Sequence, residues 1–241
     1  MVTKLQGAII AAGRGERLRI STRDDIPKPL VKLGGEAMLS RQARALVDAG
    51  ADSVVAVINS ETARIAGEMA IEIPTSIRLV VRDTANSMET MLALGALLEP
   101  GWFIASTVDA VIPQIELVRF VNESRRKIED CRDKNLLGAL AVTRWRGEAK
   151  PLFTDVTASG LILGLGNRQT SIVTAGLYFL STGIFDYAAD ARRAGLDALR
   201  RFLAMLIERG MRLDAIEIEG SIDVDEASDL DAARLAIRKM P

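Results

Sequence analysis

The amino-acid sequence predicts an α/β protein built on a mostly parallel, doubly wound sheet of the Rossmann-like kind, with helices on both faces. Two observations favour this class. Short apolar runs alternate with segments of helical period over residues 1–130, which is typical of a parallel sheet buried on both faces. Residues 131–241 instead carry several apolar runs with few helices between them. Because no linker-like or repetitive stretch separates the two halves, we expect one domain over 1–241 with a β-rich second portion.

In the first half, each strand is expected at an apolar run and each helix at the periodic segment after it. The expected strands are 5–11, 53–58, 77–81 and 102–108. The expected helices are 37–49, ending before Gly50; 61–71; 87–98, stopping before Pro100; and 113–127, which Pro113 opens. Residues 16–27 are polar and have no period, so we expect a long loop there, and long ordered loops are usually functional.

In the second half, glycines at 160 and 166 mark turns between short strands. The expected strands are 137–143, 152–156, 161–165, 172–180 and 213–218. The expected helices are 184–191, 198–209 and 226–239. The apolar stripe of the second of these helices is more typical of core packing than of an interaction surface.

Composition excludes several classes of protein. The 241 residues carry 31 basic and 32 acidic side chains, a net charge of −1, whereas nucleic-acid binders usually show a basic excess. No apolar run approaches the ~20 residues of a membrane helix. With Cys131 as the single cysteine, no intrachain disulfide can form, and we expect a cytoplasmic protein.

The sequence contains no histidine. This absence excludes Ser-His-Asp and Cys-His catalysis and zinc sites that use imidazole. The groups that remain available for catalysis are carboxylates, cations, hydroxyls and backbone amides. Phosphoryl and nucleotidyl transfer suit that set, because they depend mostly on positioning and charge neutralisation.

The first expected strand runs into Ala11-Ala12-Gly13-Arg14-Gly15-Glu16-Arg17-Leu18, and Pro27-Lys28-Pro29-Leu30 follows. Glycines let successive backbone amides approach an anion. The two prolines restrict the backbone around Lys28. The pattern therefore predicts a cradle for a polyphosphate and an enzyme that acts on a nucleoside triphosphate; the alternative is a surface connection with solvated arginines. Leu18 stands where a dinucleotide fingerprint has its third glycine, which disfavours an NAD-dependent oxidoreductase.

The string AAGRGERL…PKPLVKLGGEAML resembles the nucleotidyltransferases of the sugar-phosphate (NDP-sugar pyrophosphorylase) type, and the resemblance extends over the chain. It implies a nucleotide-binding half at 1–130 and an acceptor-side half at 131–241. It implies that backbone at Ala11, Ala12 and Gly13 meets the nucleobase and ribose, within a loop that includes Arg14 and Gly15. Arg17 would then hold the β- and γ-phosphates, and Lys28 would neutralise charge at the α-phosphate.

Two aspartates are candidate ligands of Mg²⁺. Asp109 ends the apolar run 102–108, where the family places a metal-binding aspartate, although Val108 replaces the usual preceding glycine. Asp223 matches the metal-binding aspartate of the family's closing motif. Two carboxylates together with substrate phosphates suit Mg²⁺. Asp225, the second aspartate of that motif, is expected to cap the last helix instead.

Asn86 and Ser87 open a helix, where the family has a loop that reads the base. Asn86 and Glu89 also fit a capping box, in which each side chain bonds the backbone of the other. Both interpretations hold together if the helix N-terminus presents amides to the nucleotide.

The acceptor side is less well defined by the sequence. Thr174 and Gly176 resemble part of the family strand that passes under the acceptor, and a plain core strand is the alternative. The family's Glu-Lys-Pro string is missing, so Arg168 or Lys150 is the candidate contact to the acceptor phosphate; both are equally compatible with solvated cations.

The resemblance implies Mg-dependent transfer of a nucleoside monophosphate from an NTP to a sugar 1-phosphate, as in NDP-sugar synthesis. A cytidylyl- or guanylyltransferase acting on phosphocholine, an inositol phosphate or a molybdenum cofactor stays open, as does a non-catalytic NTP-sensing module. We expect small-molecule substrates, no nucleic acid and no membrane, and homo-oligomers are compatible with the sequence.

Overall fold

The computed structural model describes residues 4–69, 71, 74, 77–146, 151–166 and 169–239. A seven-stranded sheet in the order β12-β8-β11-β6-β1-β4-β5 runs through the molecule. Its strands are β1 (Gln6–Ala11), β4 (Ser53–Ile58), β5 (Ile77–Val81), β6 (Trp102–Thr107), β8 (Leu136–Arg144), β11 (Ile172–Ser181) and β12 (Arg212–Glu217). Only β11 is antiparallel to its two neighbours in this sheet, so the predicted mostly parallel α/β class is confirmed.

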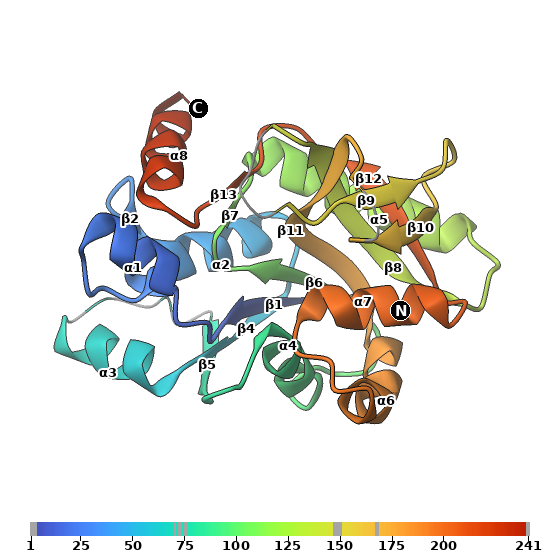
Figure 1. Cartoon of the computed structure of the whole chain (residues 1–241), viewed down its shortest axis with the longest axis horizontal. Helices are drawn as coiled ribbons and strands as arrows, with labels where there is room; N and C mark the ends of the chain where they lie inside the picture. Colours follow the sequence, from blue (N-terminus) through green and yellow to red (C-terminus); the bar gives the residue numbers. More distant parts are fainter. Residues whose placement is uncertain are drawn as a thin grey trace.

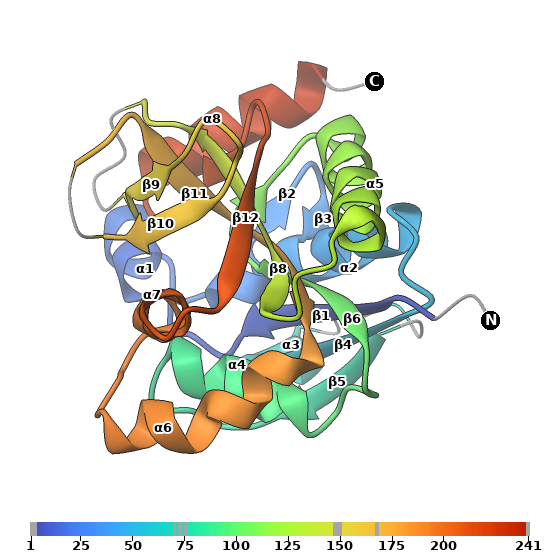
Figure 2. The same cartoon turned by 90° about the vertical axis from the view of Figure 1, so that its right-hand side faces the viewer.

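Helices cover both faces of the sheet (Figures 1 and 2). On one face, α2 (Met38–Asp48), α5 (Gln114–Asp130) and α8 (Ala227–Lys239) share a core with Ile9 and Ile104. On the other, α4 (Ser87–Gly95), α6 (Ala188–Arg193) and α7 (Leu199–Glu208) pack on residues such as Phe103 and Leu140. The helix α3 (Ser60–Glu68) joins β4 to β5. No described helix is long and apolar enough to cross a membrane.

The chain path creates a crevice at the carboxyl ends of β1 and β6. From β1 the chain passes through α2 to β4 and through α3 to β5, and then returns through α4 to β6 on the opposite side of β1. At such a reversal of strand order the connections leave in opposite directions, and ligands bind there in open α/β sheets.

The predicted long loop at 16–27 is wrong in its first part, because α1 (Glu16–Thr22) is a helix. Leu18 is its one buried residue, and Ile20 is largely exposed, so the segment shows no amphipathic period. The hydroxyls of Ser21 and Thr22 bond the Leu18 carbonyl, and Arg23 ends the helix at a φ of 55°. A helix of seven residues that buries one apolar side chain has no recognisable apolar period in the sequence.

Several short elements were not predicted. The 3₁₀ turns are η1 (Lys28–Leu30) and η2 (Thr182–Tyr187), the second of which takes the first part of the helix expected at 184–191. The minor sheets pair β2 (Lys32–Leu33) with β3 (Glu36–Ala37), β7 (Ala110–Val111) with β13 (Ile222–Asp223), and β9 (Thr154–Val156) with β10 (Ile162–Leu165). The β9–β10 hairpin was expected as strands and lies beside α7 and β12 (Figure 1).

Candidate active site

A cavity of about 660 Å³ opens in the crevice beyond β1 and β6. Its wall is formed by the β1–α1 loop, the residues before α4, the end of β6 and Lys28 of η1. All the residues predicted to bind nucleotide line it, namely Ala11, Ala12, Gly13, Arg14, Gly15, Asn86 and Ser87. Arg17, Lys28 and Asp109 line the same cavity. We call it the nucleotide cavity below.

The Pro27–Leu30 segment fixes Lys28 inside this cavity. The Leu30 amide donates to the Pro27 carbonyl at 2.8 Å, and Pro29 and Leu30 are buried. The Lys28 side chain is 9% exposed, and its Nζ donates to Asp109 Oδ2 and Asp225 Oδ1, each at 2.8 Å. Burial acts to lower the pKa of Lys28, but the Asp109 and Asp225 carboxylates outweigh it and raise that pKa above its ordinary value. Lys28 is therefore held as a cation.

Gly15 permits this placement of Lys28. Its φ is 64°, and a Cβ at this position would lie 2.7 Å from Lys28 Cβ. A side chain at 15 would thus meet both a disfavoured backbone conformation and a steric clash. Gly13 differs, because a Cβ there would meet no atom within 4 Å. Open space at Gly13 is compatible with the close approach of a nucleotide.

Asp225 joins the C-terminal part of the chain to the phosphate loop. Its Oδ2 accepts from Arg17 Nη2 at 2.6 Å while its Oδ1 accepts from Lys28. The expectation that Asp225 caps α8 is wrong: Asp229 Oδ2 accepts the amides of Asp225 and Glu226, and Ser21 Oγ accepts that of Ala227. With its backbone held by Asp229, the Asp225 carboxylate is free to bond two cations.

The β7–β13 pair brings the two predicted metal ligands side by side. Asp223 lies opposite Ala110 in this ladder, and the Val224 amide donates to the Asp109 carbonyl at 3.1 Å. Burial opposes ionisation of Asp109, but the charge and the hydrogen bond of Lys28 hold the pKa of Asp109 below its usual range. Asp223 lines a hollow that water reaches, and partial desolvation there together with the charges of Asp109 and Asp225 raises the pKa of Asp223 to about 8.

These two carboxylates fit Mg²⁺ by their chemistry. Both are hard oxygen donors, one just before β7 and one on its partner strand β13, and the Asp109 and Asp225 carboxylates add negative charge beside Asp223. A divalent cation would relieve that repulsion. Among the described residues no group of three acidic, cysteine or histidine side chains is assembled to hold a metal by itself. A cation at this place would draw further ligands from substrate phosphates and water, as Mg²⁺ commonly does.

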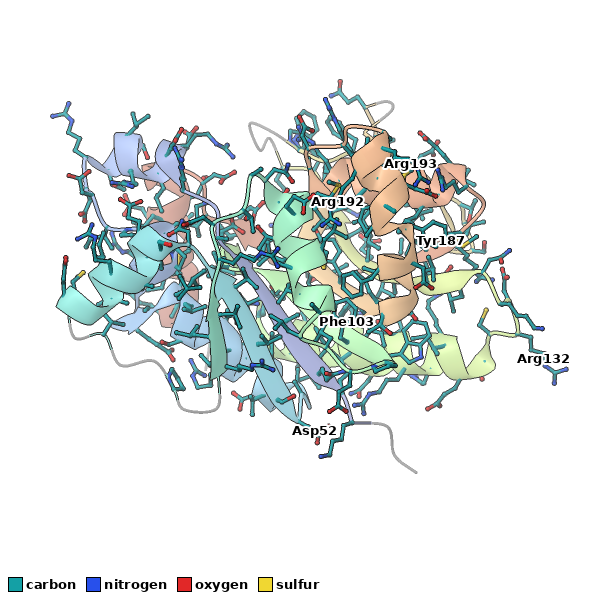
Figure 3. All side chains as sticks on the ribbon, turned by 90° about the horizontal axis from the view of Figure 1, so that it is seen from below. Asp52, Phe103, Arg132, Tyr187, Arg192 and Arg193 are labelled. Atoms are coloured by element: carbon teal, nitrogen blue, oxygen red, sulfur yellow. The ribbon has the colours of Figure 1, made fainter. Side chains whose placement is uncertain are left out.

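At the other end of the cavity, Asn86 caps α4, since its side chain accepts the Glu89 amide at 3.0 Å. The reciprocal half of the expected capping box is not formed, because the Glu89 carboxylate pairs with Arg192 of α6 at 2.8 Å. Figure 3 labels Arg192. The Ser87 hydroxyl accepts the Leu199 amide and so fixes α7 against α4.

Sequence reasoning missed Asn59, which donates to the Ala12 carbonyl at 3.1 Å and caps α3.

A second cavity of about 270 Å³ lies beside the first, towards β8, β11 and the start of α8. Arg17 and Asp225 line both cavities and form a shared wall, and Asp223 and Thr174 line the second one. Gly176 lines neither: at its φ of 68° a Cβ would lie 2.6 Å from Thr107 Oγ1 and 2.9 Å from Ala110 Cβ. Packing therefore explains this glycine. Lys150 and Arg168 lie outside the described residues.

Comparison with known proteins identifies the family of this chain. Residues 7–175 match the MobA-like NTP transferase domain. The chain belongs to this family. It is 35% identical over 186 residues to a bifunctional enzyme IspD/IspF of Brucella anthropi; this covers 75% of the chain, which spans only 40% of that relative's length.

Solved structures of similar fold cover nearly all of the NTP transferase chain. An inositol-1-phosphate CTP transferase from T. maritima gives a TM-score of 0.75 at 16% identity, covering 98% of this chain and 97% of the other. A putative glucose-1-phosphate thymidylyltransferase from Bacillus anthracis gives 0.79 at 15% identity, covering 98% and 96%. A UDP-glucose pyrophosphorylase complexed with UDP-glucose gives 0.76 at 15% identity, covering 99% and 100%. The family and the fold expected from the sequence are thus confirmed.

Proposed function

We propose that this NTP transferase domain moves a nucleoside monophosphate from an NTP to a phosphorylated small-molecule acceptor and releases pyrophosphate. The observation that carries the proposal is the convergence of two cations and three carboxylates where the two cavities meet. Arg17 lies on α1 and Lys28 on η1. The carboxylates come from the residues after β6, from β13 and from the turn before α8, namely Asp109, Asp223 and Asp225.

In the proposed reaction, an acceptor phosphate oxygen forms a bond to the α-phosphorus. The bond from the α-phosphorus to the α,β-bridging oxygen breaks, and pyrophosphate leaves with that electron pair. The nucleophile is already an anion, so no side chain has to remove a proton. This requirement agrees with a sequence that contains no histidine.

Lys28 and Arg17 would neutralise the charge of the bound triphosphate. Lys28, at the floor of the nucleotide cavity, would face the α-phosphate, and Arg17 would hold the β- and γ-phosphates. Both now bond carboxylates, so phosphate oxygens would take over part of that hydrogen bonding. Donors fixed in advance cost little reorganisation when charge develops in the transition state.

Asp109 and Asp223 would hold Mg²⁺. When bound, the ion supplies positive charge to the phosphates and the leaving group. The backbone of Ala11, Ala12 and Gly13 would contact the nucleobase and ribose, with Asn86 lining the same cavity. In the second cavity, Thr174 would contact the acceptor, with Gly176 in the strand beneath it and Arg168 or Lys150 as candidate phosphate contacts.

A sugar 1-phosphate is the first candidate acceptor, by analogy with the thymidylyltransferase and pyrophosphorylase folds. A cytidylyl transfer to a non-sugar acceptor is the second candidate. The IspD/IspF identity and the fold shared with an inositol-1-phosphate CTP transferase favour it.

The test is a screen for pyrophosphate release with the four NTPs, Mg²⁺ and a panel of phosphorylated acceptors. We expect release that requires both one NTP and one acceptor, with the nucleoside monophosphate recovered on the acceptor phosphate. Thermal stabilisation by NTP without pyrophosphate release from any acceptor would instead identify a nucleotide-sensing module.

A further inference from the structure

Asn59 makes two hydrogen bonds that serve different parts of the chain. It follows β4 and is buried, at 7% exposure. Its Oδ1 accepts the Thr62 amide at 2.7 Å and so caps α3, while its Nδ2 donates to the Ala12 carbonyl at 3.1 Å. Serine or aspartate would serve equally well for the cap alone. An ionised aspartate has no donor, however, and serine is shorter, so the choice of asparagine is explained by the bond to Ala12.

This bond fixes the direction of one peptide group in the nucleotide cavity. Ala12 and Gly13 both line that cavity, and the peptide bond between them is trans. In a trans peptide the C=O and the N–H point in opposite directions. Since β1 lies between β4 and β6, the Ala12 carbonyl points towards Asn59 beyond β4. The Gly13 N–H then points to the β6 side, where Thr107 and Asp109 line the cavity.

Packing alone does not hold this peptide group. Gly13 has no side chain, and a Cβ at this position would meet no atom within 4 Å. Without a partner for the Ala12 carbonyl, the peptide group would be free to rotate, and the ligand would have to order it on binding. The Asn59 amide therefore orients the Gly13 N–H before a ligand arrives.

The start of α3 also anchors a second wall of the nucleotide cavity. The Asp83 carboxylate accepts the Ser60 amide at 2.9 Å and the Ser60 hydroxyl at 2.6 Å. Asp83 directly precedes residues 84–87, which line the cavity. Two adjacent residues, Asn59 and Ser60, thus connect the loop after β1 with the segment before α4.

We propose that Asn59 is a positioning residue for the nucleotide. Through the Ala12 carbonyl it directs the Gly13 N–H at the base and ribose part of the NTP. The inference rests on the nucleotide site of the proposed function and adds a residue to it. Asn59 itself does not line the nucleotide cavity, so its effect on the ligand passes through the backbone of Ala12 and Gly13.

Asn59→Ser tests the inference on the full chain, because serine keeps the cap of α3 and removes the bond to Ala12. The probes are the α,β-methylene analogues of ATP, CTP, GTP and UTP, and inorganic tripolyphosphate, each titrated by calorimetry with Mg²⁺. We expect the affinity for the best-bound analogue to fall about threefold to tenfold. The affinity for tripolyphosphate should stay unchanged, because that probe lacks the base and ribose. A general distortion of the site would weaken both.

Two further variants separate positioning from stability. Asn59→Asp has the same shape, keeps the cap and loses only the donor, so it should lose at least as much analogue affinity as Asn59→Ser. Asp52→Ala is the matched control. The Asp52 carboxylate accepts the Leu5 amide at 2.8 Å and ties β1 to β4 at the opposite end of these strands (Figure 3). Its loss should lower Tm and leave analogue affinity unchanged.

Unchanged analogue affinity in both Asn59 variants would overturn the inference, and so would an equal loss of affinity for tripolyphosphate. Neither result bears on pyrophosphate release. Absence of that release with every NTP and acceptor would remove the proposed function, while the binding comparison would still decide the role of Asn59. If the unaltered chain binds none of the analogues, both the inference and the proposed function fail.

Discussion

The two cavities on either side of the Arg17–Asp225 pair are built differently. On the nucleotide side, Lys28 is nearly buried, bonds two carboxylates at 2.8 Å and sits in a turn fixed by two prolines. The second cavity is lined by the exposed carboxylates of Asp223 and Glu226 and by the half-buried Asp225 and Asp229, which are already bonded to cations or backbone amides. Under the proposed function, the side that would meet the NTP is ordered in advance by buried ion pairs, whereas the side that would meet the acceptor keeps exposed side chains.

Lys28→Ala is expected to have the largest effect and tests the nucleotide side of this comparison. It removes the one cation bonded to both Asp109 and Asp225, and we expect turnover to fall about 10²- to 10³-fold. The sheet core does not include Lys28, so far-ultraviolet circular dichroism should stay that of a folded protein. Lys32→Ala removes an exposed lysine nearby and should leave pyrophosphate release unchanged. Near-normal turnover in Lys28→Ala would remove Lys28 from its assigned role.

Asp225→Asn is expected to have the next largest effect. The amide keeps the shape of the side chain but loses the charge that aligns Arg17 and Lys28, so kcat should fall about tenfold to a hundredfold. Asp231→Asn, on α8 shortly after Asp225 and paired only with Arg234 among the described residues, is the matched control. If both variants lose the same small amount, Asp225 does not position the cations.

Gly13 and Gly15 are expected to have different roles: Gly15 is required by the packing of the loop, and Gly13 leaves room for the nucleotide. Gly15→Ala forces a left-handed alanine against Lys28 and should cost about 1–2 kcal/mol of unfolding free energy, together with turnover. Gly13→Ala meets open space, so it should keep its stability but raise the KM for NTP. Urea unfolding and steady-state kinetics measure both. An equal loss of stability in the two variants would contradict this division between a structural glycine and a ligand-facing one.

The smallest expected effect concerns Asp223 and pH. Its folded-state pKa of about 8 lies above its ordinary value of 3.8, so the folded chain binds a proton more tightly than the unfolded chain. Between about pH 4 and pH 8 this group therefore makes stability fall as pH rises.

Asp223→Asn removes that slope. Without metal, the variant should gain stability over the unaltered chain between pH 6 and pH 9. Because water reaches Asp223, the gain should be only about 1 kcal/mol, or about 2–4 °C in Tm. Asp231→Asn serves again as control. A Tm difference that stays constant from pH 6 to pH 9 would show that Asp223 titrates normally.

Much of the nucleotide side could be predicted from the sequence because its signals are local. The glycines, Lys28 and its flanking prolines lie between Gly13 and Pro29, and each acts through its own backbone preference. The long strands and helices were predicted because burial on one or both faces leaves a period. The assignment of the chain to a single domain stays a prediction.

What could not be predicted depends on distant contacts. Asp225 meets Arg17 across 208 positions, and its neighbours Glu226 and Asp229 look like an ordinary helix start. The two-residue strands that align Asp109 with Asp223 are too short to show alternation. Gly176 is the opposite case. The sequence around it suggests that a ligand approaches the backbone there, but close packing against Thr107 and Ala110 explains why the residue is a glycine.

The central claim is that Asp109 and Asp223, 114 positions apart, share one metal ion with a nucleotide held by Lys28 and Arg17. Electron paramagnetic resonance of Mn²⁺ bound with a non-hydrolysable NTP analogue tests it most directly. We predict one tight nucleotide-dependent ion per chain, with affinity weakened about tenfold or more in Asp109→Asn and in Asp223→Asn. Unchanged Mn²⁺ affinity in both variants would contradict the account.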